Sequence, residues 1–501
     1  KVIKGNRMTN SSAYFWNQDN LKQATQGQWH HSDKAEIDAR RIVTDTRQIQ
    51  AGDVFLAIKG ERFDAHDFIQ NAYQQGASAA IVERVVDCDM PQLLVADTKL
   101  ALGNLGKFRR DAHPDLTVIA LTGSSGKTTT KEMIGAILSQ IAPTLITRGN
   151  LNNDLGVPMM LLELTDEHRF LVIELGANHL GEIAYTASMV RPDVALILNI
   201  GTAHLGEFGG RANIACAKSE IYSALTSQGV AILPFSDDFY PELLKQASQF
   251  TKLHLSFGER AVPIEQAGLE ATDQAMLKAE GISSVLMMGD LFADDIETFA
   301  THSTFTLNTN IDIDQIDSLP VHLPFIGEHN VANALAAASA TFALGVPLEQ
   351  IAKGLLRAMP PKGRLMRLSM DGYHIIDDTY NANPTSMLAA AKVLEAELDT
   401  KILVLGDIFE LGDAADDEHT KLGHQLALLE IDHVFTLGNH MAHTAAAINE
   451  QKPIARHYTD KPSLLKDLCQ LLSHGSATVL FKGSRGMAME SLIADLTACN
   501  H

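Results

Sequence analysis

The sequence contains little cysteine, with four among its 501 residues. Cys88, Cys216, Cys469 and Cys499 lie far apart in the chain. They have neither the paired spacing of a zinc site nor the density of a disulfide framework. This composition fits a reducing compartment, and we therefore expect a cytoplasmic protein.

Long apolar runs and excess positive charge are also missing. No apolar segment approaches the ~20 residues of a membrane-spanning helix, and the polar beginning, with Asn10, Ser11 and Ser12, does not resemble a secretory signal. The 40 basic residues are outnumbered by 61 acidic residues, which gives a formal net charge of -21. Since this charge repels polyanions, we expect neither nucleic acid nor an anionic membrane surface as a partner. The lack of a long apolar run predicts that the chain does not insert into a membrane. Residues 1–7 precede Met8 and are left out of the fold argument.

The chain does contain a repeated alternation of short apolar strands and helices. With 46% hydrophobic residues, a chain of this length can form about three domains. Strands that are apolar throughout, such as 194–200, are typical of parallel sheets covered by helices on both faces. Pro360, Pro361 and Gly363 break the helical pattern and mark a candidate hinge. The sequence predicts an α/β protein with a small substrate domain, a central P-loop domain and a C-terminal Rossmann-like domain, at residues 8–96, 97–362 and 363–501.

One part of the central region departs from this alternation. Between residues 251 and 323 the strand-like runs are not separated by long helices. We therefore predict an antiparallel edge or subsheet formed by residues 253–257, 284–288 and 303–307.

A glycine-rich loop follows the apolar run that ends at Leu121. It reads Thr122-Gly123-Ser124-Ser125-Gly126-Lys127-Thr128-Thr129, and a helical pattern comes next. Such loops bring backbone N–H groups close to a triphosphate, while Lys127 can reach the β and γ phosphates and the Thr128 hydroxyl can bind Mg²⁺. The strict P-loop pattern requires glycine in place of Leu121, but the order of strand, loop and helix favours nucleotide binding over an incidental turn. The loop alone does not separate a ligase from a motor or a kinase.

Three polar residues lie at or just beyond the ends of apolar strands. Glu174 ends one strand, His204 follows the next, and Lys218 lies on the helical stretch after that. Open α/β sheets place their ligands at this edge. Considered singly, each residue also has an ordinary explanation: a cap partner, a structural histidine and a solvated lysine.

Taken together, these motifs resemble the Mur ligases of peptidoglycan synthesis, and the resemblance covers essentially the whole chain after Met8. The run Asp45-Thr46-Arg47, with the later Lys59-Gly60 and Asp64-Ala65-His66, is similar to the UDP-binding domain of that family. The segment from Gly149 to Asn153 resembles the part that approaches ATP, metal and substrate. His329-Asn330 resembles the adenine-contacting helix start, and Gly363-Arg364 resembles the arginine that reaches the nucleotide from the domain junction.

The C-terminal runs resemble one branch of the family, which adds D-alanyl-D-alanine. These runs are residues 377–387, 406–412 and 482–485. The Asp-Asn-Pro-Arg motif expected of the diaminopimelate-adding branch is missing from the sequence.

The resemblance implies ATP-dependent amide formation between UDP-N-acetylmuramoyl-tripeptide and D-alanyl-D-alanine through an acyl phosphate, by a monomer. It implies two Mg²⁺ ions and carbamylation of Lys218, which would turn a cation into a metal ligand. The implied catalytic residues are Lys127, Lys218, His204, Glu174 and Arg364. The implied metal ligands are Thr128, Glu174, His204 and Lys218. The implied ATP-binding residues are Gly123, Ser124, Ser125, Gly126, Lys127, Thr128, Thr129, Asn330, Arg364 and Asp378. The implied substrate-binding residues are Asp45, Thr46, Arg47, Asn150, Asn152, Asn153, Asn381, Asn383, Ser484 and Arg485.

Three other functions remain open at this point. Another amino-acid ligase of the same family would share most of these motifs. A P-loop motor or regulatory NTPase would release phosphate without any acceptor. A nucleotide-sugar binding module without catalysis would leave Lys127, Glu174 and Lys218 without a shared role. The third residue of the tripeptide, meso-diaminopimelate or lysine, is also left open.

Overall fold

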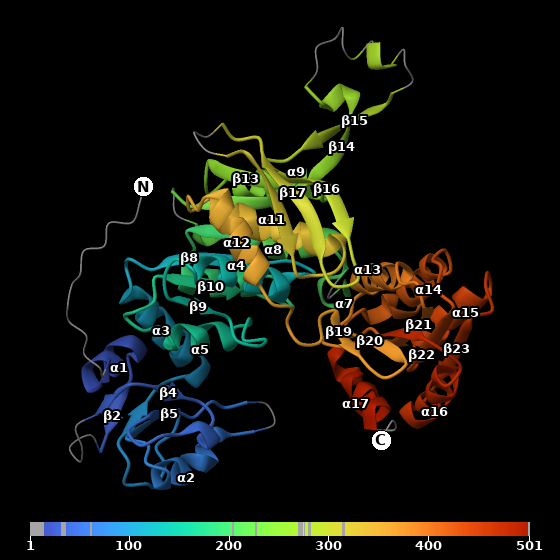
Figure 1. The fold of residues 1–501 in the computed structure, drawn as a ribbon. Helices are drawn as coiled ribbons and strands as arrows, with labels where there is room; N and C mark the ends of the chain where they lie inside the picture. Colours follow the sequence, from blue (N-terminus) through green and yellow to red (C-terminus); the bar gives the residue numbers. More distant parts are fainter. Residues whose placement is uncertain are drawn as a thin grey trace.

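The computed structural model of the protein describes residues 15–31, 37–60, 63–202, 205–225, 228–268, 274, 276–278, 282–312 and 316–498. Residues 1–7 and Cys499 lie outside these ranges. Figure 1 shows three α/β regions, with the first at the lower left, the central region above and the third at the lower right. The predicted α/β fold class with mostly parallel sheets is confirmed. Among the described residues, no helix is long and apolar enough to cross a membrane.

The first region contains a five-stranded sheet with the order β2-β7-β6-β5-β4. Its strands are β2 (Gln28–His30), β4 (Ile42–Val43), β5 (Val54–Leu56), β6 (Ala79–Val82) and β7 (Gln92–Leu94). All neighbouring pairs are parallel except β2–β7. Helices α1 (Gln18–Thr25), α2 (Ile69–Gln74) and α3 (Thr98–Asp111) accompany it, and a short ribbon pairs β1 (Trp16–Asn17) with β3 (Asp38–Ala39).

The central region is built on a nine-stranded sheet with the order β18-β17-β16-β13-β12-β11-β8-β10-β9. Its parallel part consists of β8 (Thr117–Thr122), β9 (Thr144–Ile146), β10 (Phe170–Glu174), β11 (Val194–Ile197), β12 (Val230–Pro234) and β13 (Leu253–Phe257). Alternate strand residues face opposite sides, so the sheet has two apolar cores. One core lies under α4 (Lys127–Leu138), α11 (Glu328–Phe342) and α12 (Leu348–Arg357). The other lies under α5 (Gly156–Leu162), α6 (Glu182–Val190), α8 (Arg211–Ser219) and α9 (Tyr240–Ala247).

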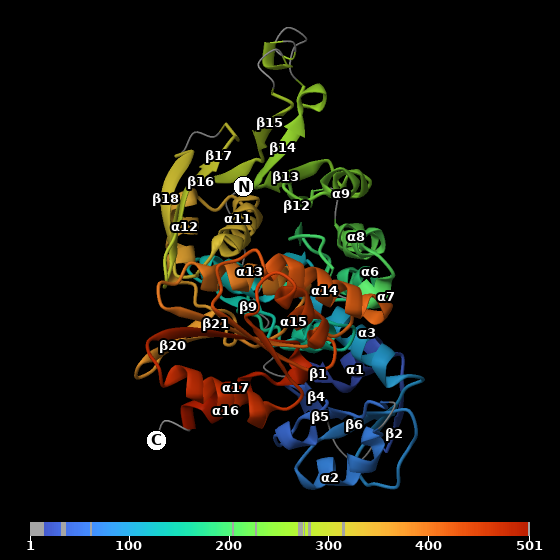
Figure 2. The same ribbon diagram turned by 90° about the vertical axis from the view of Figure 1, so that its right-hand side faces the viewer.

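The predicted antiparallel edge is only partly right. Leu253–Phe257 forms β13, which is parallel to β12. The physical reason is α9, whose eight residues are enough to carry the chain back across the sheet between the two strands. The antiparallel edge is made by β16 (Leu291–Thr298), β17 (Ser303–Thr309) and β18 (Ser318–Leu323). Residues 284–288 form β15, which pairs with β14 (Glu259–Pro263) in a separate ribbon that extends away from the molecule in Figures 1 and 2.

The third region has a six-stranded sheet with the order β19-β20-β24-β21-β22-β23. Its strands are β19 (Met366–Ser369), β20 (Tyr373–Asp378), β21 (Thr400–Gly406), β22 (His433–Leu437), β23 (Ala455–Tyr458) and β24 (Ala477–Lys482), parallel except for β19–β20. One face packs on α13 (Pro384–Glu395), α14 (Ala415–Leu426) and α15 (Met441–Asn449). The other packs on α16 (Lys461–Leu472) and α17 (Glu490–Ala498).

The central and third regions touch at two glycines. Gly206 lies in α7 (Leu205–Phe208), and Gly412 begins a turn of the third region. A Cβ added to Gly206 would lie 2.5 Å from the backbone nitrogen of Gly412, and the Gly206 N–H donates to the carbonyl of Glu410 at 3.2 Å. This close backbone approach brings the loop 406–412 beside the carboxyl edge of the central sheet.

Candidate active site

The predicted phosphate loop joins β8 to α4. Gly126 precedes the helix with a φ of +81°, a conformation that glycine adopts without strain. The amide oxygen of Asn199 accepts a hydrogen bond from the Ser125 N–H at 3.0 Å. The Lys127 ammonium donates to the carbonyl oxygen of Gly123 at 2.8 Å, so the lysine folds over the loop. Backbone N–H groups, a helix N-terminus and an ammonium group together form an anion site.

Glu174 lies beside this loop because β10 pairs with β8, where Glu174 is opposite Leu121. Its carboxylate is buried and accepts two hydrogen bonds, from the Thr128 hydroxyl at 3.2 Å and from the Asn152 amide at 2.7 Å. Mg²⁺ prefers oxygen ligands and usually takes one or two carboxylates together with phosphate and water. Glu174 and the Thr128 hydroxyl therefore fit an Mg²⁺ ion on a bound nucleotide.

Lys218 lies in the last turn of α8 and is 3% exposed. Burial lowers the pKa of its ammonium well below the usual value, nearby Lys127 lowers it further, and Glu174 opposes the shift. Because burial disfavours the charged form, the site favours the neutral amine. Neither an ammonium nor a neutral amine supplies the oxygen ligand that Mg²⁺ prefers, so an anionic, oxygen-bearing modification of the lysine would fit the predicted role of metal ligand.

His204, the remaining predicted metal ligand, lies outside the described residues. Within the part of the chain that is described, no cluster of three His, Cys, Asp or Glu side chains could hold a metal ion. The metal prediction for Thr128, Glu174, His204 and Lys218 therefore stays a prediction.

Arg364 reaches the phosphate loop from the start of the third region. One of its Nη atoms donates to the Thr128 hydroxyl at 3.2 Å, across 236 residues of sequence. Its guanidinium carbon lies 4.5 Å from the centroid of the Tyr380 ring. The flanking Gly363 and Leu365 have φ values of +71° and +52°. A turn through the left-handed region therefore directs Arg364 back toward the central region.

A cavity of about 530 Å³ opens between the loop, α11 and the third region. Its apolar lining includes Leu198, Phe257 and Phe325, which suit a flat base. Its polar lining includes Asn330, Asn333, Arg364, Asp378 and Lys482. The cavity thus brings the predicted nucleotide residues of two regions to one site.

His329 also lines this cavity, at the start of α11. Burial lowers the pKa of His329 to about 4, and nearby Asp378 opposes this shift. The imidazole is therefore neutral at pH 7. Sequence reasoning missed Phe257 and Phe325, because single aromatic residues in strand-like and turn-like segments carry no distinguishing pattern.

The predicted dipeptide residues make local contacts. Asn383 caps α13: its side-chain oxygen accepts the Ser386 N–H at 2.8 Å, and its amide group reaches the Ser124 carbonyl at 3.5 Å. The Ser484 hydroxyl accepts the Phe409 N–H. The Arg485 N–H donates to the Asn381 side chain. These residues lie together at the carboxyl ends of β20 and β24, near the phosphate loop.

The predicted substrate residues of the first and central regions lie in two places. Asp45 caps the turn Thr46–Gln48 and forms a two-oxygen ion pair with Arg47. Asn152 and Asn153 lie before α5, where the Asn153 side chain accepts the Gly156 N–H. Asn150 is exposed. The structure therefore brings Asn152 into contact with Glu174 but leaves the run 45–47 at the carboxyl edge of the first sheet.

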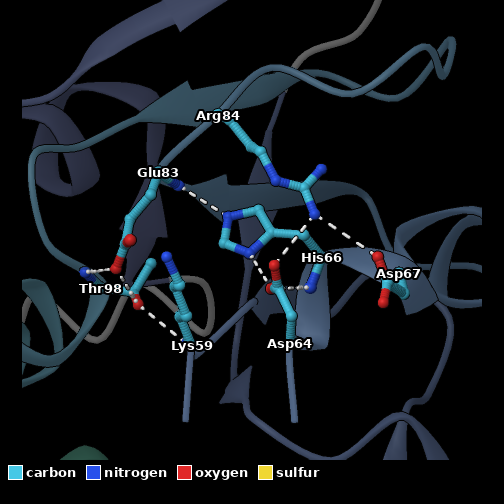
Figure 3. Close-up of polar contacts among 7 residues, drawn as sticks. All are labelled: Lys59, Asp64, His66, Asp67, Glu83, Arg84 and Thr98. Atoms are coloured by element: carbon cyan, nitrogen blue, oxygen red, sulfur yellow. Dashed lines mark hydrogen bonds and ion pairs between the residues drawn. The ribbon is translucent and has the colours of Figure 1, made fainter. Parts of the chain in front are cut away.

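The Asp64-Ala65-His66 motif forms a hydrogen-bond network around the buried His66 ring in the first region (Figure 3). One ring nitrogen of His66 contacts the Asp64 carboxylate at 2.6 Å, and the other accepts the Glu83 N–H at 2.8 Å. The Glu83 carboxylate in turn accepts both the N–H and the hydroxyl of Thr98 at the start of α3. Because both nitrogens of His66 are engaged, the motif fixes the loop after β5 against β6, and the neighbouring Lys59 is held at this edge by its backbone N–H.

Comparisons with known proteins agree with this arrangement. Residues 39–110 match the model of the Mur ligase family catalytic domain, residues 121–341 the Mur ligase middle domain, and residues 363–485 the Mur ligase glutamate ligase domain. UDP-N-acetylmuramoyl-tripeptide–D-alanyl-D-alanine ligase of Escherichia coli (strain K12) is 40% identical over 466 residues, which cover 92% of this chain and 94% of that protein. The Haemophilus influenzae protein of the same name is 39% identical over 471 residues, with the same coverage of both chains.

Solved structures give the same result. A crystal structure of MurF from Acinetobacter baumannii is 50% identical, with a TM-score of 0.84, and covers 96% of this chain and 98% of its own. The MurF ligase from Thermotoga maritima in complex with ADP is 29% identical, with a TM-score of 0.74, and covers 91% of this chain and 97% of its own. The sequence identity, the three domain matches and the geometry of the cavity lead to one conclusion: the chain belongs to the Mur ligase family.

Proposed function

We propose that the protein is an ATP-dependent ligase that adds D-alanyl-D-alanine to UDP-N-acetylmuramoyl-tripeptide and so makes the pentapeptide precursor of peptidoglycan. The observation that carries this proposal is the near full-length identity to ligases named for that reaction. The convergence of Lys127, Glu174, Lys218 and Arg364 on one loop supports it. ATP and these acceptors are found in the cytoplasm, which is where we place the protein.

The reaction needs an activated carboxyl group, because a carboxylate has no usable leaving group. The terminal carboxylate of the tripeptide attacks the γ-phosphorus of ATP, which gives an acyl phosphate and ADP. The amine of the dipeptide then attacks the acyl carbon, phosphate leaves, and the nitrogen loses a proton. Lys127 and Arg364 offset the negative charge that gathers between carboxylate and triphosphate. Bound Mg²⁺, held by Glu174 and the Thr128 hydroxyl, would neutralise more of that charge.

Lys218 is proposed to be carbamylated. Its neutral amine adds to carbon dioxide and releases one proton, which leaves an anionic carbamate at the end of the side chain. The burial that lowers the pKa of Lys218 supports this, because only the neutral amine reacts. Supplying ¹³C-labelled carbon dioxide should give a carbamate carbon resonance in the wild-type protein and none in Lys218→Met.

The three regions are proposed to divide the substrates, with boundaries at residues 96 and 362. Residues 8–96 would bind the UDP-linked peptide at the carboxyl edge of their sheet, where Arg47 and Lys59 lie. Residues 97–362 would bind ATP, and residues 363–501 would bind the dipeptide near Asn381, Asn383, Ser484 and Arg485. We propose a monomer that closes about residues 360–363. Solution scattering with and without an ATP analogue and tripeptide should differ, and identical profiles would contradict closure.

Product analysis tests the proposed function. The protein is incubated with ATP, Mg²⁺, D-alanyl-D-alanine and a UDP-linked tripeptide that ends in meso-diaminopimelate or in lysine. Mass spectrometry should show the tripeptide plus dipeptide minus one water, with one ADP for each product. Phosphate release at full rate without either acceptor would support a plain NTPase instead. Transfer of a single amino acid to a shorter muramyl peptide would support another branch of the family.

A further inference from the structure

Lys482 ends β24 and is almost completely buried, with a side chain 4% exposed. Its ammonium lies 2.5 Å from Oδ2 of Asp378, whose side chain is 11% exposed. It also donates to the carbonyl oxygen of Asn381 at 2.9 Å. The sequence placed Lys482 in a run that resembles a dipeptide-binding segment. In the structure its ammonium is engaged within the protein by these two groups.

The other carboxylate oxygen of Asp378 connects this pair to the turn that carries Arg364. Oδ1 accepts the Leu365 N–H at 3.2 Å. Leu365 has a φ of +52°, a conformation that is unfavourable for a residue with a side chain, so the turn needs outside support. That support comes from Asp378 and from the Tyr380 N–H, which donates to the Gly363 carbonyl at 3.1 Å.

A buried carboxylate depends on its cation. Without Lys482, Asp378 would be an unpaired charge inside the protein, and its carboxylate would be expected to turn toward water or to pair with another donor. Either change alters the acceptor that holds the Leu365 N–H. The turn could then relax, and Arg364 would lose the direction that brings it to the Thr128 hydroxyl.

We propose that Lys482 is a positioning residue for nucleotide binding, which acts through Asp378 and the Leu365 backbone on the direction of Arg364. Its ammonium is engaged by Asp378 and the Asn381 carbonyl, so this role requires no contact with the dipeptide or with the reacting atoms. The inference rests on the proposed nucleotide site, and so its main test measures nucleotide affinity without turnover.

The first measurement is calorimetric binding of ADP with Mg²⁺ to the full chain. Lys482→Met should weaken binding at least about tenfold, because it removes one partner of a buried charge pair. Lys461→Met is the matched control. Lys461 is a lysine of the same region that donates to two neutral groups, the Ala488 carbonyl and the Ser491 hydroxyl, and does not line the cavity. Its replacement should leave ADP affinity within about twofold.

A double-variant cycle separates positioning from general stability. If Lys482 acts through Arg364, Lys482→Met should have little further effect on ADP affinity in an Arg364→Ala background. If the two substitutions weaken ADP binding by factors that multiply, Lys482 acts independently of Arg364, and the proposal is overturned. Lys482→Gln, which keeps a hydrogen-bond donor but not the charge, serves if the methionine variant does not fold, and the same loss of affinity is expected.

Steady-state kinetics gives the second readout. If Lys482 positions Arg364, the Lys482→Met variant should have a raised KM for ATP and a nearly unchanged KM for D-alanyl-D-alanine. A raised dipeptide KM with normal ADP affinity would overturn the proposal and return Lys482 to the dipeptide site. If the wild-type protein makes no pentapeptide product at all, the proposed function fails, while the ADP measurements still decide the role of Lys482.

Discussion

Replacing Gly126 with alanine should damage nucleotide binding more than folding. Gly126 has a φ of +81°, and a Cβ at this position would overlap the side-chain oxygen of Asn333 on α11. Asn333 is itself fixed, because its amide group donates to Asn330 at 3.0 Å. Either the loop or the Asn333 side chain must therefore shift in the variant, and a shift of Asn333 would disturb its hydrogen bond to Asn330.

The free-energy cost of Gly126→Ala has two parts. A residue with a side chain in the left-handed conformation costs about 1–2 kcal/mol, and overpacking at a tight contact costs about 1–3 kcal/mol. If the loop keeps its geometry, the sum of about 2–5 kcal/mol appears as lost stability. If the loop relaxes, nucleotide binding must restore the geometry, and the same cost appears as lost affinity. Because the loop lines an open cavity, we expect relaxation and at least about tenfold weaker ADP binding, which corresponds to about 1.4 kcal/mol.

Gly345→Ala provides the matched control. Gly345 has a φ of +82° in the turn after α11, and nothing lies within 4 Å of an added Cβ. Gly345→Ala should therefore lose only the stability that corresponds to a side chain in the left-handed conformation. Its affinity for ADP should be unchanged. Calorimetry gives the ADP affinity of both variants, and urea unfolding gives their free energies of unfolding. The reasoning is refuted if Gly126→Ala binds ADP as tightly as the wild type and loses no more stability than Gly345→Ala.

Three further variants test other parts of the site. Lys127→Ala should reduce the rate of product formation by several powers of ten while the thermal midpoint stays near that of the wild type, and normal synthesis would show that this loop is not the ATP site. Lys218→Ala should be nearly inactive, and a short carboxylic acid in the assay should partly restore product formation; full activity without it would contradict the carbamate. Burial lowers the pKa of His329 to about 4, whereas an unfolded histidine titrates near about 6.5. The unfolded state therefore gains a proton first as pH falls through this window, so stability should drop there, and His329→Gln should flatten that part of the unfolding profile.

The phosphate loop was predictable because all parts of its signature are adjacent in the sequence. The strand before it, the glycines and the helix after it are contiguous, so the sequence carries the whole signature. Glu174 was predictable for a related reason, since parallel strands place their carboxyl ends at one edge. The capping role of Asn383 could also have been read, because Asn-Pro-x-Ser is a recognisable helix start. The sequence alone could thus have indicated that Asn383 has a structural role as a helix cap, in addition to the proposed contact with the dipeptide.

Contacts between distant segments were not predictable. The pairing of Lys482 with Asp378 joins residues that are 104 positions apart, and nothing in either local sequence indicates it. The direction of β13 depended on recognising the helix 240–247 between two strands, and eight residues are too few for a periodic pattern to separate a helix from a strand. Short elements and long-range ion pairs depend on the folded arrangement rather than on local propensity.

The hydrogen bonds at Thr128 link nucleotide binding to the placement of the third region. The Thr128 hydroxyl donates to Glu174 and accepts from Arg364, so it already has two partners without a ligand. Mg²⁺ on a bound nucleotide would compete for the same oxygen and for the same carboxylate. Arg364 would then be free to contact phosphate, and its position is fixed by a turn anchored in the third region. Nucleotide binding would therefore change a contact between two regions, and this change would give the proposed closure a direct physical cause.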